Sequence, residues 1–223
     1  MVMQVIDNFF PEEQFKKMQE VILGPNWPMC YLESIDGPEW LKVTDPLAKK
    51  SDAFCLAMYD NNNSSLGNIV TDEYLQFKPM FMEMLHRLGY NEDSLLRIKC
   101  NMTLSSPELT AEHYSIPHVD NTVEHKSIVF YVNDSDGDTR IFHQKQKPIS
   151  WRIGENATEE ERRNYARHFV QSGFTVEHSI TPKANRLLIF DGLQYHTAGF
   201  PVKSRRRVIL NMNISEKMEK VYD

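Results

Sequence analysis

The stretch that decides the fold is RVILNMNI, at residues 207–214. Alternate side chains of an extended strand lie on the same face. One face of this stretch is continuously apolar and consists of Val208, Leu210, Met212 and Ile214. The other face is mostly polar and consists of Arg207, Ile209, Asn211 and Asn213. The apolar face predicts packing against another layer of structure, and the polar face is typical of the wall of a ligand cavity.

Strands are predicted through most of the chain upstream of this stretch, back to residue 95. Alternating or β-branched residues predict strands at 96–102, 126–132, 139–142, 174–180, 186–191 and 206–214. The turn-forming residues DSDGD, at 134–138, predict a hairpin between the strands at 126–132 and 139–142. A further short strand is expected near the start of the chain, at 2–10.

Helices are predicted mainly in the first third of the chain. Pro11 suits the first turn of a helix that ends near Gly24, and a second helix is expected at about 72–88. A third is expected at about 158–171, where residues 158 and 161 have capping-box spacing. Helices first and strands afterwards predict a mainly β fold, a two-sheet β-sandwich or jelly roll braced by N-terminal helices.

The sequence predicts a single domain over residues 1–223, because it contains no internal repeat, low-complexity tract or linker. Residues 1–94 are interpreted as a bracing region of helices and strands, and residues 95–214 as the jelly-roll core. The segment at about 144–183, which contains Trp151, is longer than a hairpin requires. It is interpreted as an insertion that forms a lid or substrate wall, and the alternative is a packing excursion over a sheet.

Composition favours a soluble, cytoplasmic protein. Apolar residues make up 41% of the 223 residues, and the formal charge of -6 argues against a nucleic-acid binder that relies on phosphate attraction. Cys30, Cys55 and Cys100 are an odd number without metal-site spacing, so buried thiols in a reducing compartment are expected. The chain starts without a signal peptide, and no apolar run is long enough to cross a membrane. The oligomeric state is left open.

Two short motifs predict a metal site. His118 and Asp120 are two residues apart, so they would point to the same side of a strand. His196 follows the apolar strand at 186–191 after a short turn with Gly192, which places it at the end of a strand. Two histidines and one carboxylate form the facial set that holds non-haem Fe(II) and leaves coordination positions open. A histidine-x-aspartate motif alone is weak evidence, and the distal histidine is what strengthens it.

The other histidines fit this pattern poorly. His86 and His168 lie on predicted helices among charged residues, and His113 precedes His118 by only five residues. The remaining histidines, at positions 125, 143 and 178, lack the second half of the pattern.

Arg207 is the candidate cation for a dicarboxylate co-substrate. A 2-oxoglutarate molecule that chelates iron through its oxo-acid end needs a cation at its far carboxylate, and arginine meets a carboxylate with two parallel hydrogen bonds. Arg205 shares the predicted face of Arg207, whereas Arg206 points away. A solvated basic patch is the alternative for all three. Arg207 is favoured because Asn211 lies on the same face.

Tyr131 is a candidate for the same carboxylate. The strand at 126–132 places Ser127, Val129 and Tyr131 on one face, so the Tyr131 hydroxyl could reach the co-substrate. A core tyrosine whose hydroxyl is satisfied by the protein is the alternative, and the residues alone do not decide between the two.

Taken together, these motifs resemble the prolyl 4-hydroxylase-like branch of the Fe(II)/2-oxoglutarate dioxygenases, and small versions encoded by marine bacteriophages in particular. The similar stretches are LLRIKCNM, PHVDNT, IVFYVNDSDGDTRIF, ANRLLIFDGLQYH and RVILNMNI, which lie between about 95 and 214. Their order along the chain is more specific than any one of them. Two stretches depart from the family pattern: SSPELTAEHYSIP replaces a glycine-rich, tyrosine-containing approach to His118, and Asn213 replaces an aromatic residue.

The resemblance implies a double-stranded β-helix, a jelly roll of the cupin-like kind. It implies that His118, Asp120 and His196 are the catalytic metal ligands for Fe(II). It also implies that Arg207 and Tyr131 bind the far carboxylate of 2-oxoglutarate and that Asn211 lies near this co-substrate. O2 would be the second co-substrate, and ascorbate would support activity.

The expected function is therefore that of a 2-oxoglutarate-dependent oxygenase that hydroxylates a C–H bond and releases succinate and CO2. A peptide or protein substrate, with peptidyl proline first, is favoured over a small molecule or nucleic acid. The alternatives are a nucleobase or small-metabolite hydroxylase or demethylase, and a non-catalytic metal-binding jelly roll. If the chain is encoded by a phage, the expected compartment is the host cytoplasm.

Overall fold

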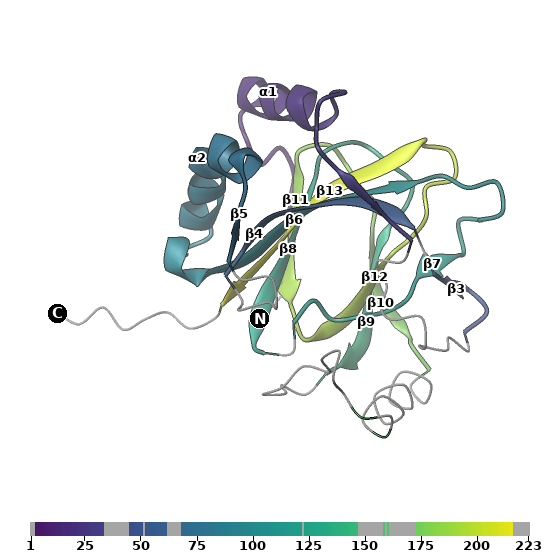
Figure 1. Ribbon diagram of the computed structural model, residues 1–223. Coiled ribbons are helices and arrows are strands. Elements are labelled where there is room, and N and C mark those ends of the chain that lie inside the picture. The colour runs from purple at the N-terminus through teal and green to yellow at the C-terminus, as the bar shows by residue number, and fades with distance from the viewer. Residues whose placement is uncertain are drawn as a thin grey trace.

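The computed structural model describes residues 3–33, 45–50, 52–61, 68–121, 123–146, 158, 160 and 173–215. Within these residues the chain forms two opposed antiparallel sheets, with two α-helices on the outer side of the larger one (Figure 1). The mainly β fold with bracing helices predicted from the sequence is confirmed. The predicted helix at 158–171 and Trp151 lie outside the described residues, apart from the isolated positions 158 and 160.

The larger sheet has eight strands, and strands that are distant in sequence are neighbours in it. Every pairing within this sheet is antiparallel. Its order is β1 (Gln4–Ile6), β11 (Arg186–Asp191), β8 (His125–Tyr131), β13 (Arg206–Ser215), β6 (Leu95–Leu104), β4 (Ala53–Asp60) and β2 (Cys30–Leu32), with β5 (Ile69–Val70) paired to β4.

The smaller sheet has three antiparallel strands in the order β10 (Val176–Ile180), β9 (Thr139–Lys145) and β12 (Gln194–Ala198). A separate parallel pair joins β3 (Ala48–Lys49) to β7 (Tyr114–Ser115). The described sheets therefore enclose an interior between β12 and β9 on one side and the centre of the larger sheet on the other (Figure 1).

Helices α1 (Glu12–Ile22) and α2 (Asp72–Arg87) cover the convex face of the larger sheet, and a short 3-10 helix (Glu92–Ser94) leads into β6. Gly89, just beyond α2, has a φ of 82°, the left-handed conformation that glycine adopts most easily after a helix. The two helices close over one apolar cluster, whose sheet members include Val208, Leu210, Met212 and Ile214. The apolar face predicted for residues 207–214 is thus confirmed.

The concave face of the larger sheet faces the smaller sheet. Ile209, Val129 and Tyr131 form a second apolar cluster there with Leu188 and Phe190. The alternation predicted for the strands at 126–132 and 207–214 is therefore observed on both faces. No helix of the described residues is long and apolar enough to cross a membrane.

The predicted hairpin between 126–132 and 139–142 is wrong. β8 belongs to the larger sheet and β9 to the smaller one, so residues 134–138 cross from one sheet to the other. The Asp136 carboxylate accepts hydrogen bonds from the backbone N–H groups of residues 202–204. A Cβ on Gly137 would lie 2.6 Å from the carbonyl oxygen of Gly199. These contacts hold the turn against another loop instead of against its own flanking strands.

Other local expectations also need correction. The strand expected at 2–10 covers only β1, and the eight-residue strand β4 was not predicted. Cys30 is exposed and Cys55 is half-buried, so only Cys100 is the buried thiol that was expected. Edge strands carry side chains whose exposure depends on which neighbours pair with them, and that pairing is not visible in a local pattern.

Candidate metal centre and co-substrate pocket

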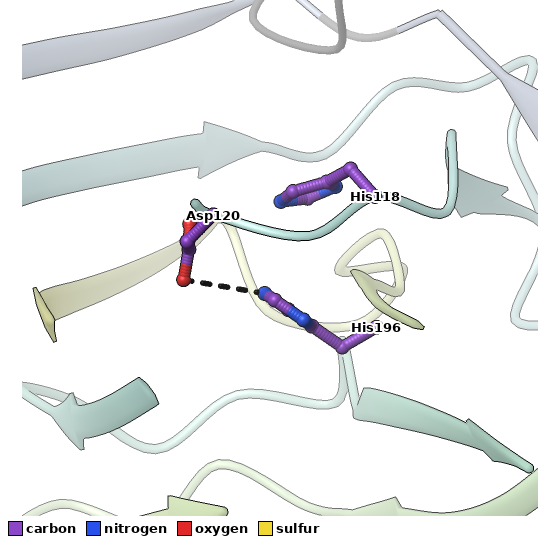
Figure 2. A group of neighbouring side chains, drawn as sticks. All are labelled: His118, Asp120 and His196. Carbon is purple, nitrogen blue, oxygen red and sulfur yellow. Dashed lines mark ion pairs between the residues drawn. The ribbon is translucent and has the colours of Figure 1, made fainter. Parts of the chain in front are cut away.

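His118 and His196 are held opposite each other by a pair of backbone hydrogen bonds. His118 N donates to His196 O at 3.0 Å, and His196 N donates to His118 O at 2.9 Å. This isolated bridge attaches the segment around His118 to β12, and the two rings lie with centroids 4.8 Å apart. Figure 2 shows both rings and the Asp120 carboxylate converging on one point. One potential ligand atom from each residue lies within 4.8 Å of the other two.

The local conformations differ from those expected. His196 lies inside β12 and not at the end of a strand. His118 makes only the single bridge, and Asp120 lies in a bend beyond it. The chain must bend here because His118 pairs with the smaller sheet, whereas Asp120 hydrogen-bonds to β13 of the larger sheet. Despite the bend, the structure brings the two histidines and the aspartate together.

Both histidines are oriented by backbone carbonyls. His118 Nδ1 lies 3.0 Å from Ile116 O, and His196 Nδ1 lies 3.1 Å from Gln194 O. A carbonyl oxygen only accepts hydrogen bonds, so each Nδ1 carries a proton and each Nε2 is the ring nitrogen left to meet a ligand. His196 Nε2 is buried and has no hydrogen-bond partner in the described chain. His196 Nε2 lies 3.4 Å from Asp120 Oδ2, so the two atoms are close enough to ligate one cation.

Asp120 is surrounded by hydrogen-bond donors. Arg97 Nη2 donates to its Oδ1 at 2.9 Å, and Ser127 Oγ donates to its Oδ2 at 2.9 Å. Asn211 Nδ2 donates to both oxygens at 3.1 and 3.2 Å, and Asn213 Nδ2 donates to Oδ2 at 3.0 Å. The carboxylate is therefore fixed in position by four side chains before any ligand binds.

The protonation states suit a cation. Burial lowers the pKa of His118 to about 4, and the nearby His196 acts in the same direction. Burial alone would raise the pKa of Asp120, but its contact with His196 and the Arg97 guanidinium hold that pKa well below its usual range. At neutral pH the cluster thus offers a neutral His118 and a charged carboxylate, and neither has to lose a proton to bind a metal.

Arg207 lies on the same concave face and is buried, with 3% of its surface exposed. Its Nε donates to Gly137 O at 2.8 Å, and its Nη2 donates to Thr139 Oγ1 at 2.7 Å. Burial lowers the pKa of Arg207. No carboxylate lies within ion-pair distance of this guanidinium in the described parts of the chain, and the neighbouring Tyr131 is its other polar side-chain contact. A buried arginine without a counter-ion indicates a site for an anionic ligand.

Tyr131 lies directly beside this arginine. Its hydroxyl donates to Thr139 Oγ1 at 2.7 Å, and the Arg207 guanidinium carbon lies 5.7 Å from the centre of its ring. Burial raises the pKa of Tyr131, so the phenol is neutral at neutral pH. The hydroxyl is satisfied by the protein and also adjoins the candidate anion site, so both interpretations of Tyr131 stay compatible with its position.

Arg207 and the metal cluster are connected through neighbouring strand positions. Thr139, which contacts Arg207, lies two residues from Ile141, and Ile141 is the strand partner of His196. Asn211, which contacts Asp120, lies on the same face of β13 as Arg207. Arg205, by contrast, is exposed and precedes the first residue of β13, so it lies outside this pocket.

Several residues of the site were not predicted from the sequence. Arg97 and Ser127 contact Asp120 directly, and Thr139 joins Tyr131 to Arg207. His125, which lacked a matching motif, is buried with its Nε2 3.4 Å from Ser127 Oγ. A Cβ on Gly192 would lie 2.2 Å from that same nitrogen. Ser127 was indicated in the sequence only by its position on the same strand face as Tyr131. Thr139 was indicated only by its place in the stretch IVFYVNDSDGDTRIF.

Solved structures with a similar fold include proteins described as a 2OG-Fe(II) oxygenase, an alpha ketoglutarate dependent epimerase and a prolyl hydroxylase. A 2OG-Fe(II) oxygenase family protein from Burkholderia pseudomallei matches with a TM-score of 0.58 at 11% identity, over 97% of this chain and 85% of that one. The non-heme alpha ketoglutarate dependent epimerase SnoN from nogalamycin biosynthesis matches with a TM-score of 0.52 at 11% identity, over 96% and 78%. The prolyl hydroxylase from Trichoplax adhaerens, solved with a peptide fragment, matches with a TM-score of 0.50 at 14% identity, over 96% and 84%.

These matches confirm the predicted jelly-roll fold. No protein-family model matches the sequence, and no curated protein matches it significantly. At 11–14% identity the solved structures establish the fold and leave the reaction to be argued from the site itself.

Proposed function

We propose that the protein is an oxygenase that uses Fe(II), 2-oxoglutarate and O2, and that it hydroxylates a C–H bond of a peptidyl proline or a related target. One observation carries this proposal. A buried arginine without a counter-ion, Arg207, lies next to a cluster of two histidines and one carboxylate. A structural metal site would need the cluster but would have no use for the arginine.

The residues of the cluster fit iron. His118 and His196 would ligate through Nε2, because Nδ1 of each ring is engaged by a backbone carbonyl. Asp120 would supply the third ligand, and a two-histidine, one-carboxylate set leaves open positions for further ligands. Side chains donate hydrogen bonds to Asp120, and backbone carbonyls accept hydrogen bonds from the two histidines. Such outer contacts orient the ligands of a metal.

The co-substrate fits between the cluster and Arg207. Its oxo-acid end would meet the metal, and its far carboxylate would pair with the Arg207 guanidinium. The Tyr131 hydroxyl would be a second donor, provided that it turns away from Thr139. When bound, iron and 2-oxoglutarate supply the oxidising chemistry, with succinate and CO2 as co-products. The protein holds these groups in position and excludes water with the surrounding apolar residues Val129, Leu188 and Phe190.

A peptide substrate is supported by the match to a prolyl hydroxylase that was solved with a peptide fragment. The match to SnoN, which is described as an epimerase from nogalamycin biosynthesis, supports a small-molecule substrate as the second candidate. The two substrate classes share the metal chemistry, so an experiment can separate them without affecting the proposal for the cofactor.

The test is succinate formation by purified protein supplied with Fe(II), 2-oxoglutarate, O2 and ascorbate. We expect slow succinate release without substrate and faster release with a library of proline-containing peptides, together with a gain of one oxygen atom in the reacting peptide by mass spectrometry. Small metabolites and oligonucleotides test the alternative substrates. Bound iron and 2-oxoglutarate without succinate under all these conditions would instead support a non-catalytic metal-binding role.

A further inference from the structure

Lys99 lies on the concave face of β6, close to the metal cluster. Its neighbours Ile98 and Cys100 are buried in the convex cluster, whereas Arg97, two residues away, reaches Asp120. Lys99 must therefore point to the side of Asp120, because alternate residues of a strand share a face. It is half-buried, and it makes no hydrogen bond or ion pair with the described residues.

The strand neighbours of Lys99 are a small residue on one side and a polar residue on the other. In the register of the sheet it lies between Asn211 on β13 and Ala57 on β4. Ala57 is small, and the Nδ2 group of Asn211 is already directed at Asp120. Arg97 contributes a second cationic group, and its Nε is buried without a hydrogen-bond partner among the described residues. Lys99 and Arg97 thus lie on the same face of β6, and neither uses all of its donors among the described residues.

The charge around Lys99 is only partly compensated. Asp120 is taken up by Arg97, and Asp60 lies opposite Arg97 on β4 but not within ion-pair distance of Lys99. Burial lowers the pKa of Lys99, and the nearby Arg97 acts in the same direction. An ammonium group kept in such a position is stabilised when an anion binds beside it.

In the proposed function, the bound metal would increase the positive charge near Lys99. Fe(II) would add two positive charges, and the oxo-acid carboxylate of the co-substrate would cancel one of them, while its far carboxylate is neutralised by Arg207. Asp120 offsets Arg97, whereas Lys99 has no ion-pair partner among the described residues, so its positive charge would add to the one that remains on the metal. An anion from outside the protein would compensate it.

We propose that Lys99, with Arg97 beside it, forms an anion-binding subsite that receives a carboxylate or phosphate group of the substrate. The inference rests on the proposed function and narrows its substrate class to molecules with a negative group near the C–H bond that is oxidised. Lysine is suited to either anion, because its ammonium is a point charge without the planar fork of arginine.

The test uses full-length protein with Mn(II) in place of iron and saturating 2-oxoglutarate, so that no turnover occurs. Inorganic phosphate and acetate are the probes, and their nuclear relaxation reports how closely each approaches the paramagnetic metal. We expect both anions to relax faster with wild-type protein and to bind roughly tenfold or more weakly to Lys99→Met, which keeps the length of the side chain but removes its charge. Lys203→Met, at an exposed loop lysine, is the matched control and should behave like wild type.

Two results would overturn the subsite. Equal anion binding by Lys99→Met and wild type would show that Lys99 does not contribute. If Lys99→Met bound the probes as tightly as wild type but bound 2-oxoglutarate more weakly, Lys99 would contact the oxo-acid carboxylate of 2-oxoglutarate and not a substrate anion.

Failure of the proposed function would look different, because the electron paramagnetic resonance spectrum would then show no bound Mn(II). In that case the subsite is tested on metal-free protein through its melting temperature at matched ionic strength in phosphate and in chloride. Extra stabilisation by phosphate in wild type and Lys203→Met, but not in Lys99→Met, supports the subsite. Equal stabilisation of all three proteins contradicts it.

Discussion

The two faces of β13 come from the same ten residues and are almost equally buried, yet they make different kinds of contact. On the convex face, Val208 and Leu210 are each 1% exposed and pack into the cluster under the helices. On the concave face, Arg207 is 3% and Asn213 is 1% exposed, and both are polar. Burial therefore does not distinguish the faces. The difference is that the convex face is stabilised by apolar packing alone, whereas the buried polar groups of the concave face are stabilised by hydrogen bonds, such as those from Asn211 and Asn213 to Asp120.

This contrast predicts that the faces separate stability from activity. Changes on the convex face should lower the free energy of unfolding and leave the activity of each folded molecule intact. Changes at the site on the concave side should do the reverse. The following variants test that separation, beginning with the largest expected effect.

His196→Ala removes one of the proposed metal ligands. We expect metal-dependent succinate formation to fall by more than about 100-fold, since even residues that only support a ligand are worth 10–100-fold. The melting temperature should change little, and metal binding can be followed by Mn(II) titration. His113→Ala is the matched control, because His113 lies outside the cluster and contacts Thr110 instead. Equal activity losses in both variants would contradict the assignment of the site.

Arg207→Met removes the buried cation that is proposed to bind 2-oxoglutarate. Leaving a buried carboxylate without its partner costs about 3–5 kcal/mol, so the dissociation constant for 2-oxoglutarate should rise roughly 100-fold or more. Calorimetric titration measures it directly. Arg205→Met should have a small effect, because Arg205 is exposed and precedes β13. The reverse order of the two effects would move the proposed anion site to Arg205.

Leu210→Ala tests the convex face. A buried leucine truncated to alanine loses about 2–5 kcal/mol of the free energy of unfolding. Urea denaturation should show that loss, while 2-oxoglutarate affinity measured well below the melting temperature stays unchanged. Leu75→Ala on α2, where the side chain is 54% exposed, is the control and should cost much less. A large change in co-substrate affinity would mean that the faces are not independent.

Asp136→Asn tests the turn that connects the sheets. Backbone N–H groups of residues 202–204 hold the pKa of Asp136 at about 2 against the opposing effect of burial. A lowered folded-state pKa stabilises the protein above the ordinary value near 3.8, and this contribution is lost as the pH falls from about 4 toward 2. The variant should therefore be less stable by about 1–2 kcal/mol at pH 7 and match wild type near pH 2. Asp93→Asn, which removes a carboxylate from the short helix before β6, controls for net charge.

Much of this architecture follows from local patterns. The alternation of residues 207–214 distinguished the two faces because the apolar side chains and the polar side chains point to opposite sides of the strand. Only one orientation of the strand places the apolar side chains against the helices. His118, Asp120, His196 and Arg207 were selected because few residue types bind iron or a carboxylate. The structure places all four on one interior, although their roles as ligands stay predictions.

What could not be predicted depends on contacts between distant segments. Arg97 is an ordinary alternating residue of its strand, and only the bend at Asp120 brings the two together. The crossing at 134–138 has the composition of a hairpin turn, and it becomes a crossing because Asp136 binds the loop at 202–204. Sequence patterns describe the turn itself, whereas its role depends on a loop more than sixty residues away.

Gly137 and Gly199 make the orientation of Arg207 sensitive to positions that would touch no ligand. A Cβ on Gly137 would lie 2.6 Å from Gly199 O, a Cβ on Gly199 would lie 3.1 Å from Asp138 N, and Gly137 O is the acceptor for Arg207 Nε. A larger residue at 137 would therefore require the backbone beside this carbonyl to shift, and one at 199 would require a smaller shift. In a deep mutational scan that selects for tight 2-oxoglutarate binding, substitutions at these two glycines should therefore be depleted, as substitutions at the charged residues should be. Such a map would follow the packing of the main chain, and an inhibitor that competes with 2-oxoglutarate would encounter resistance mutations there.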